Sequence, residues 1–423
     1  MDKLISSKFI LLLNKYIYGR IRKNLLRAKM KYKNTIFIII ALISASLIWL
    51  PSMHVVFQED VDNFISEEKL SPITRKLANY QINLWINEDV RKQEIGRMRL
   101  SNGEWDFMGR TFLVMALTNI SIIDEKYKEN SLKIINKIID DTLKLEKENG
   151  IHFFLLPYSK ASPFVVKPER SQFIDGEIAL MLALSRLLKE NEEYKIELDK
   201  RIEIMVNRMN NAITMNLESY PDECWLFCNS ISLLSIRLKD YLDGTDHSEF
   251  FEKWMISAKQ YLLDKKTGLL ISSFSMNGTQ LDGPEGSSIF LAAHCLSFIY
   301  KDFAREQYIK AKLELGKNIL GFGYATEWPD SWVGPQDIDS GPIIPFINLS
   351  AGSTGFAFLG AVSFRDNKYL KTLLSSLNLG GFPLEKNDKL RYCGSNQVGD
   401  AVLLYSSVAR ILPQYLKKRF KNE

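Results

Sequence analysis

The residues best suited to chemistry are carboxylates held in short segments rich in glycine and proline. Glu285 stands in Gly283-Pro-Glu-Gly-Ser, directly before an apolar helical pattern, and Asp337 and Asp339 stand in Asp337-Ile-Asp-Ser-Gly-Pro342. Proline fixes the backbone and glycine permits unusual conformations, so such segments present a carboxylate in one position. Proton transfer needs that fixed geometry. We therefore predict that Glu285 and Asp339 act as the general acid and base.

Other acids and several aromatic residues stand near the starts of further helical patterns. A pair of carboxylates across a cleft, with aromatic platforms, is what glycoside hydrolysis requires. Asp175 and Glu177 are predicted to share in catalysis, and the predicted substrate-binding residues are Trp105, Asp106, Asp222, Trp225, Trp332, Asp337, Tyr392 and Asn396. The alternative for each single acid is a helix cap or a salt bridge.

The cysteines and histidines do not form a recognisable metal or disulfide pattern. Cys224 and Cys228 are four residues apart, which on one helix is a poor geometry for a mutual disulfide. The four histidines include no H-x-x-x-H pair, and no Gly-x-Ser-x-Gly elbow or phosphate-binding loop occurs. We predict no metal and no cofactor.

Apolar residues recur with helical spacing over most of the chain, and no long strand-like alternation competes with them. This periodicity predicts about twelve helices, at residues 72–89, 104–121, 130–147, 174–190, 192–215, 223–239, 248–264, 286–300, 303–319, 351–365, 367–378 and 397–412. Residues 151–156 and 269–274 are at most hairpin arms or extended loops. Six helical hairpins predict an all-α (α/α)6 toroid in one domain. An open solenoid is the alternative, but its repeats would share a motif, and none is found.

Polar clusters precede or open every second predicted helix. They lie at residues 102–106, 170–177, 220–225, 282–288, 332–342 together with 350–355, and 391–397. If these helices form a parallel inner ring, their N-termini meet at one end of the toroid, where the helix dipoles favour anionic groups. Ordinary capping explains one polar residue per loop. It does not explain acids, indoles and Gly-Pro segments arriving together, so we expect a functional mouth there.

Two segments resemble the linalool dehydratase/isomerase family, whose fold is an (α/α)6 barrel. They are Asp222-Glu-Cys-Trp-Leu-Phe-Cys-Asn229 and Asp175-Gly-Glu-Ile-Ala-Leu-Met-Leu-Ala-Leu184, and the resemblance covers about the middle third of the chain. It implies that Cys228 is a catalytic cysteine. Ser219 and Glu177 stand where the family has a second cysteine and a catalytic histidine.

Positive charge is concentrated at the N-terminus. Residues 1–33 hold ten Lys or Arg against one acid, a local charge of +9, so the remainder of this chain of net charge +5 carries −4. Nucleic-acid binding by the main part is therefore not expected. Residues 34–57 include no charged residue and could form roughly 35 Å of helix, enough to span a bilayer. With Glu59, Asp60 and Asp62 beyond it, the positive-inside rule places the N-terminus in the cytoplasm.

These observations predict a cytoplasmic tail (residues 1–33), a membrane anchor (34–57), a linker (58–71) and an extracytoplasmic toroid (72–423). A cleaved signal peptide and a buried core helix are the alternatives for the anchor. The predicted function is carboxylate chemistry on a glycan or other polyhydroxyl substrate. A hydro-lyase acting on a small alcohol through Cys228 and Glu177, and a non-catalytic glycan-binding or envelope protein, are the alternatives.

Overall fold

A computed structural model describes residues 2–336 and 340–420, with side chains from residue 15 onward. The chain divides into two compact units, Met1–Val56 and Phe57–Glu423. Asp339, predicted as catalytic, and Asp337, predicted to bind substrate, lie outside the described residues.

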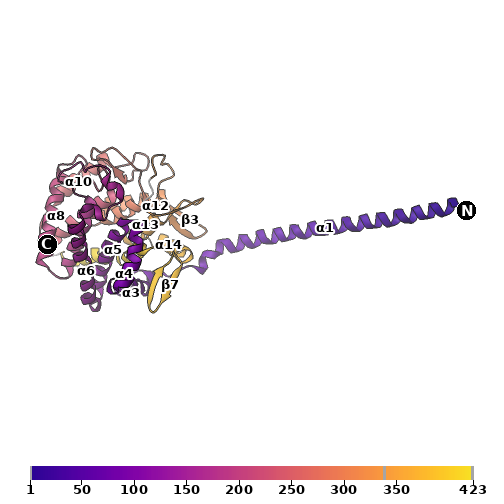
Figure 1. The fold of residues 1–423 in the computed structure, drawn as a ribbon, viewed down its shortest axis with the longest axis horizontal. Helices are drawn as coiled ribbons and strands as arrows, with labels where there is room; N and C mark the ends of the chain where they lie inside the picture. Colours follow the sequence, from indigo (N-terminus) through magenta and orange to yellow (C-terminus); the bar gives the residue numbers. More distant parts are fainter. Residues whose placement is uncertain (1, 337–339, 421–423) are drawn as a thin grey trace. The chain divides into compact units, whose positions relative to one another are not determined.

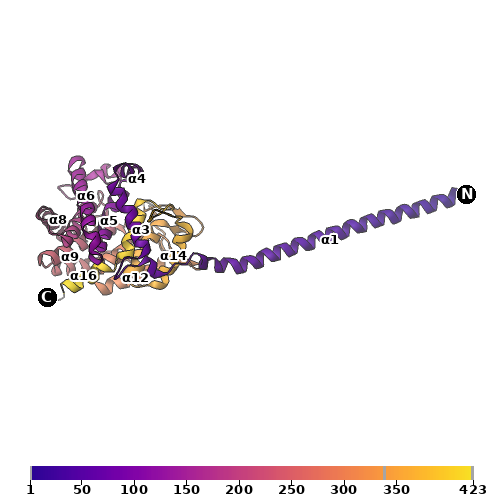
Figure 2. The same cartoon turned by 90° about the horizontal axis from the view of Figure 1, so that it is seen from below.

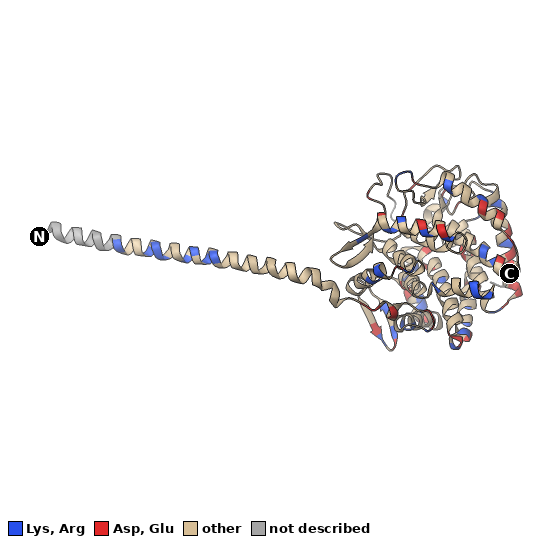
Figure 3. Ribbon diagram, turned by 180° about the vertical axis from the view of Figure 1, so that it is seen from behind, with Lys and Arg blue, Asp and Glu red and all other residues tan. Residues whose placement is uncertain are grey.

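The first unit is one helix, α1 (Asp2–Val56). Figure 3 shows its lysines and arginines in the N-terminal part and an uncharged stretch after them. Apolar side chains of that stretch, such as Phe37, Leu47 and Trp49, are exposed, so it is not a core helix of the toroid. By length and composition, this stretch and α5 (Gly103–Ile123) are the two described helices that could cross a bilayer, but α5 is mostly buried within the protein.

Six helices of the second unit form a closed inner ring, in which each contacts the next and the last contacts the first. They are α5, α7 (Gln172–Leu188), α9 (Leu226–Asp243), α11 (Gly286–Leu296), α13 (Ala351–Ser363) and α15 (Gln397–Val408). Every residue from 172 to 187 is buried, as expected for a helix surrounded by other helices. All six were predicted from their apolar periodicity.

Outer helices cover this ring and alternate with the inner ones along the chain (Figures 1 and 2). They are α3 (Pro72–Ile86), α6 (Glu125–Asn149), α8 (Glu192–Asn210), α10 (Ser248–Tyr261), α12 (Lys301–Leu315) and α14 (Asn367–Gly380). Each places one apolar stripe inward, as Ile135, Ile138 and Ile139 do on α6. The predicted (α/α)6 toroid is confirmed.

Short antiparallel strand pairs lie in the loops between the helices. β1 (Cys224–Trp225) pairs with β2 (Ser273–Phe274), β3 (Gly316–Ile319) with β4 (Phe322–Ala325), β5 (Ile343–Ile344) with β6 (Leu349–Ser350), and β7 (Pro383–Lys386) with β8 (Lys389–Tyr392). Residues 316–319, predicted as the end of a helix, are therefore a strand. Residues 151–156 include a short 3-10 turn, η1 (Ile151–Phe153), and a second, η2 (Pro157–Lys160), follows.

Three further helices were not predicted. α4 (Glu88–Ser101) buries only Met98, so it has no apolar stripe to recognise. The end of the predicted last helix is a separate helix, α16 (Ile411–Arg419), and α2 (Val61–Phe64) lies in the predicted linker.

Residues 58–71, predicted as a linker, make contacts with the toroid. Phe64 is fully buried, and the Thr74 hydroxyl donates to Oγ of Ser407 (2.8 Å), which ties this segment to the inner ring. Residues 58–71 therefore belong to the packed second unit, and no free spacer precedes it.

Candidate active site

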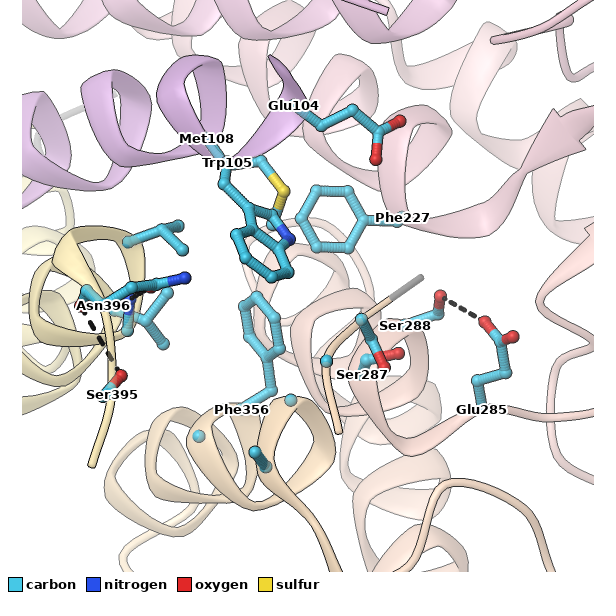
Figure 4. A pocket seen from close by; sticks show the side chains of 18 of the residues that line it. Glu104, Trp105, Met108, Phe227, Glu285, Ser287, Ser288, Phe356, Ser395 and Asn396 are labelled. Carbon is cyan, nitrogen blue, oxygen red and sulfur yellow. Dashed lines mark hydrogen bonds between the residues drawn. The ribbon is translucent and has the colours of Figure 1, made fainter. Parts of the chain in front are cut away.

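A cavity of about 270 Å³ lies at the N-terminal ends of the inner helices (Figure 4). Each inner helix contributes to its wall, through Trp105, Phe173, Cys228, Ser287, Gly352 and Val398 in chain order. The polar clusters predicted to meet at one end therefore do meet around one cavity. Its volume is just below the range of about 300–1,000 Å³ usual for ligand pockets, which suits one small ligand or a short stretch of a polymer.

Part of the cavity wall is aromatic. Trp105, Phe227 and Phe356 face it, and the rings of Phe227 and Phe356 meet edge to face with centroids 5.6 Å apart (Figure 4). Trp225 also lines the cavity. Rigid rings of this kind offer flat apolar surfaces while the indole N–H groups stay available for hydrogen bonds. The predicted platforms Trp105 and Trp225 are thus in place.

Glu104, in the first turn of α5, is a lining carboxyl group with a raised pKa. It is half-buried and lines the cavity, and desolvation by the surrounding protein raises its pKa from 4.5 to about 7. The Tyr220 hydroxyl donates to Oε1 of Glu104, and the backbone N–H of Leu156 donates to that hydroxyl (2.8 Å). Asn102 caps α5 by accepting from the Glu104 N–H (2.8 Å). This carboxyl group is therefore fixed in place and half protonated near neutral pH.

Glu285, predicted as catalytic, is a second lining carboxyl group. It stands at the N-cap of α11, its backbone N–H donates to Oγ of Ser272 (2.7 Å), and the Ser288 hydroxyl donates to its Oε2 (3.4 Å). Figure 4 shows Glu104 and Glu285 coming from different helices around the cavity. Cys228 lines the same cavity, so Glu285 and Cys228 share one site.

Glu177 lies just outside the cavity wall. Its side chain is fully buried, Oε2 accepts from the Thr111 hydroxyl (2.6 Å), and Oε1 has no hydrogen-bond partner among the described residues. Burial, and to a smaller extent the charge of Glu104, raises the pKa of Glu177 to about 8. The carboxyl group is thus protonated at neutral pH and does not touch the cavity space.

We predict that Glu177→Gln makes the thermal stability less dependent on pH. Because the pKa of Glu177 is higher in the folded chain than in the unfolded chain, its contribution to stability is full below about pH 4.5 and is lost as pH rises through about 8. Glutamine stays neutral and keeps an acceptor for Thr111. The melting temperature of the variant should exceed that of the wild type at pH 9, whereas exposed Glu129→Gln should change little; equal pH slopes would contradict the assignment.

Asp106 and Asp175, predicted to shape or share the site, are turned away from the cavity into ion pairs. Asp106 binds Arg110 (2.9 Å) and Arg99 (3.2 Å). Asp175 binds Arg170 and buried Arg201 (2.7 Å). Neither acid lines the cavity. The salt-bridge alternative considered for each of them is what the structure shows.

The other predicted residues lie at different distances from the cavity. Asn396 lines it and caps α15 by accepting from the Gly399 N–H (3.1 Å). Asp222 is exposed and accepts from the Met276 N–H (3.0 Å), outside the lining. Trp332 donates through its indole N–H to the carbonyl of Pro335 (2.8 Å), and Tyr392 is buried; neither lines the cavity.

One carboxylate behind the wall was missed. Glu327, which follows β4, is buried and accepts hydrogen bonds from the hydroxyls of Ser287 (2.5 Å), Ser340 (2.9 Å) and Ser350. Ser287 and Ser340 both line the cavity. Glu327 therefore fixes two parts of the wall, and only contacts between distant segments reveal it.

A second missed acid, Asp400, lies in the first turn of α15. It accepts from the Tyr392 N–H (3.2 Å), and burial raises its pKa to about 8. Among the described residues, no group of three or more His, Cys, Asp or Glu is placed to hold a metal ion. The chemistry that these residues offer is proton transfer by carboxyl groups.

Comparison with known proteins gives the fold. No protein-family model and no curated protein matches the chain. One similar solved structure is the GH76A α-1,6-mannanase of Salegentibacter sp. HEL1_6, at 11% identity over 81% of this chain and 98% of that one, with a TM-score of 0.50.

Two related structures are also similar. An inactive variant of that enzyme in complex with α-1,6-mannotetrose has 12% identity, the same coverage and a TM-score of 0.49. The GH76 α-mannanase of Bacteroides thetaiotaomicron has 12% identity over 75% of this chain and 87% of that one, with a TM-score of 0.44. At 11% identity, the likeness to the GH76A mannanase with a TM-score of 0.50 shows the fold alone. The resemblance to linalool dehydratase/isomerase stays a prediction.

Proposed function

We propose that this chain is a toroidal glycoside hydrolase that cleaves a glycan by carboxyl-group chemistry in the cavity. The observation that carries the proposal is Glu104, a fixed carboxyl group with a pKa near 7, in a cavity that also holds Glu285. Glycoside hydrolysis needs an acid that is still protonated near neutral pH and a second carboxylate that stays ionised.

In this proposal Glu104 protonates the oxygen of the departing sugar. The Tyr220 hydroxyl donates to Oε1 of Glu104, so Oε2 is left to carry the transferable proton. Glu285 serves as the ionised partner, either activating water or attacking the sugar directly. Trp105 and Phe356 supply platforms for the sugar ring, and Asn396, Ser287 and Ser288 supply polar groups for its hydroxyls.

The substrate class is suggested by the toroids that resemble this chain. Those enzymes are named as α-1,6-mannanases, and one is bound to α-1,6-mannotetrose. We propose α-1,6-linked manno-oligosaccharides as the first substrates to try, followed by other glycans. The apolar stretch of α1 is proposed to anchor the enzyme in the membrane with the toroid outside, as the charge asymmetry predicts.

Glu285→Gln is the first test of this proposal. Glutamine cannot ionise, so release of reducing ends by the purified full-length chain should fall about 10²–10⁴-fold. The melting temperature should change little, because the Glu285 backbone contact to Ser272 is retained. Full turnover in the variant would show that Glu285 is not catalytic. Binding without turnover in the wild type would instead favour a glycan-binding protein.

A hydro-lyase is the second candidate, because Cys228 lines the cavity beside apolar residues such as Phe227 and Phe356. In that case Cys228→Ser should abolish dehydration of a small alcohol, and Glu285→Gln should not. In the hydrolase, Cys228→Ser should retain most of the activity. Comparing these two variants on both substrate classes therefore separates the two functions.

A further inference from the structure

The chain enters the toroid at an apolar surface. Phe57, the residue directly after α1, packs its ring against Phe322 (centroids 6.2 Å apart), and its carbonyl accepts from the Asn378 side chain (3.2 Å). Phe57 follows Val56, the last residue of α1, directly in the chain. Whatever surrounds the apolar stretch of α1 must therefore lie close to Phe57.

Large apolar side chains are exposed on or next to the two elements that Phe57 contacts. We call Ile319, Leu320, Leu379 and Phe382 the anchor-side patch, and these side chains expose 42%, 46%, 37% and 66% of their surface. Ile319 is paired with Phe322 in the β3–β4 hairpin, and Leu379 follows Asn378 on α14. Residues 318–326 and 376–383 include no charged residue, so placing them against lipid would desolvate no charge.

The contacts between β4 and α14 show that these residues lie at one end of the two elements. The Tyr369 hydroxyl donates to the carbonyl of Tyr324 (2.8 Å), and the space beside Gly323 is filled by Thr372. α14 and β4 therefore run antiparallel, so the C-terminal end of α14 lies near the start of β4 and near Leu320. Figure 1 shows β3, β7 and α14 on one side of the toroid and α8 on the other.

The backbone at the patch is unusual for a surface in water. Leu320 and Gly321 form the two-residue loop of the β3–β4 hairpin, with φ of 51° and 89°. Such loops strongly favour Asn-Gly or Asp-Gly, because a residue with a bulky side chain is strained at positive φ. The β7–β8 hairpin has the expected residues, Asn387 and Asp388, at φ of 53° and 56°. Leu320 is exposed in a backbone conformation that favours asparagine. Its apolar side chain therefore points to a contact with an apolar surface.

The same surface adjoins the cavity. The backbone N–H of Cys393 donates to the carbonyl of Phe382 (3.1 Å), and that of Gly394 donates to the carbonyl of Gly381 (2.9 Å). Gly394 and Ser395 line the cavity. The patch therefore lies at the end of the toroid where the inner helices begin.

We propose that the anchor-side patch docks the toroid onto the surface of the bilayer that α1 enters, with the cavity end of the toroid nearest the membrane. The proposal rests on the anchoring part of the proposed function and is independent of hydrolysis. Apolar side chains insert into the boundary between headgroups and acyl chains. A small patch suffices because the covalent tether keeps it at high effective concentration near the lipid. The substrate would then be a glycan held close to the membrane.

The test uses the full-length chain in vesicles of phosphatidylcholine and phosphatidylglycerol. Cys393→Ser removes the exposed thiol and leaves three buried cysteines. An environment-sensitive fluorophore is then attached at Leu320→Cys, or at Ile196→Cys as a control on α8, where Ile196 is 62% exposed. Nitroxide-labelled lipid should quench the fluorophore at position 320 severalfold more than at position 196. Equal quenching, or a chain that alkaline carbonate extracts from the vesicles, would overturn the proposal.

Leu320→Asn provides the complementary variant. Asparagine is favoured in this loop, so the melting temperature should be unchanged or higher, while quenching of a fluorophore at Phe382→Cys should fall severalfold. Hydrolysis of a soluble substrate in detergent should not change. Unchanged quenching at position 382 would show that Leu320 does not contribute to docking.

Discussion

Replacing Glu104 by glutamine is expected to lower kcat about 10²–10⁴-fold on any oligosaccharide that the wild-type chain cleaves. Glutamine keeps the shape of the side chain and can still accept the hydrogen bond from Tyr220. It has no acidic proton to transfer to the departing sugar. The measurement is initial rates at saturating substrate, with the melting temperature recorded for both chains.

Glu385→Gln is the matched control. Glu385 is an exposed glutamate on β7 that pairs with Lys76 (2.7 Å), away from the cavity. Its replacement should leave kcat unchanged. If Glu104→Gln retains wild-type turnover, Glu104 is not the proton donor. If it unfolds the chain, the raised pKa of Glu104 reflects a structural role.

Replacing Arg201 by methionine is expected to lower the free energy of unfolding by about 3–5 kcal/mol. Arg201 is buried on α8 and binds Asp175 (2.7 Å), Glu146 (2.6 Å) and Glu197 (2.7 Å). Methionine fills part of the space but leaves Asp175 with only Arg170 as a partner. The loss should therefore come from the acidic cluster, in which Asp175, Glu146 and Glu197 no longer share a buried cation.

Urea denaturation of the full-length chain in detergent measures this loss. Lys253→Met removes an exposed i,i+4 pair with Glu249 on α10 and should cost at most about 1 kcal/mol. Similar losses in the two variants would show that the Arg201 cluster is not a stabilising network. Because Asp175 does not touch the cavity, the Arg201 variant should keep its activity at temperatures where it is folded.

The toroid could be predicted from sequence because its inner helices must be apolar on all sides. α7 and α11 show this clearly, because residues 178–184 and 289–293 are apolar without a break. α4 was missed because it packs only Met98 into the core, and the β3–β4 hairpin was missed because its residues continue the apolar pattern of α12.

The candidate site was harder to predict because periodicity does not fix which side of a helix faces a cavity. Glu104 and Asp106 are two residues apart, which on a helix places them on nearly opposite faces. Asp106 was predicted to bind substrate, but Arg99 and Arg110 bind it, and Glu104 lines the cavity. Glu327 had no local signal at all, because its three serine partners come from distant segments.

The dependence of kcat/KM on pH, measured for the wild type and for Tyr220→Phe, tests most directly whether Glu104 is the general acid. Glu104 must be protonated to act, so activity should fall as pH rises through about 7. The hydrogen bond from Tyr220 lowers the pKa of Glu104, so its loss should move this fall to higher pH. A wild-type rate that rises through pH 7, or a fall that Tyr220→Phe leaves in place, would contradict the assignment of Glu104 as the acid.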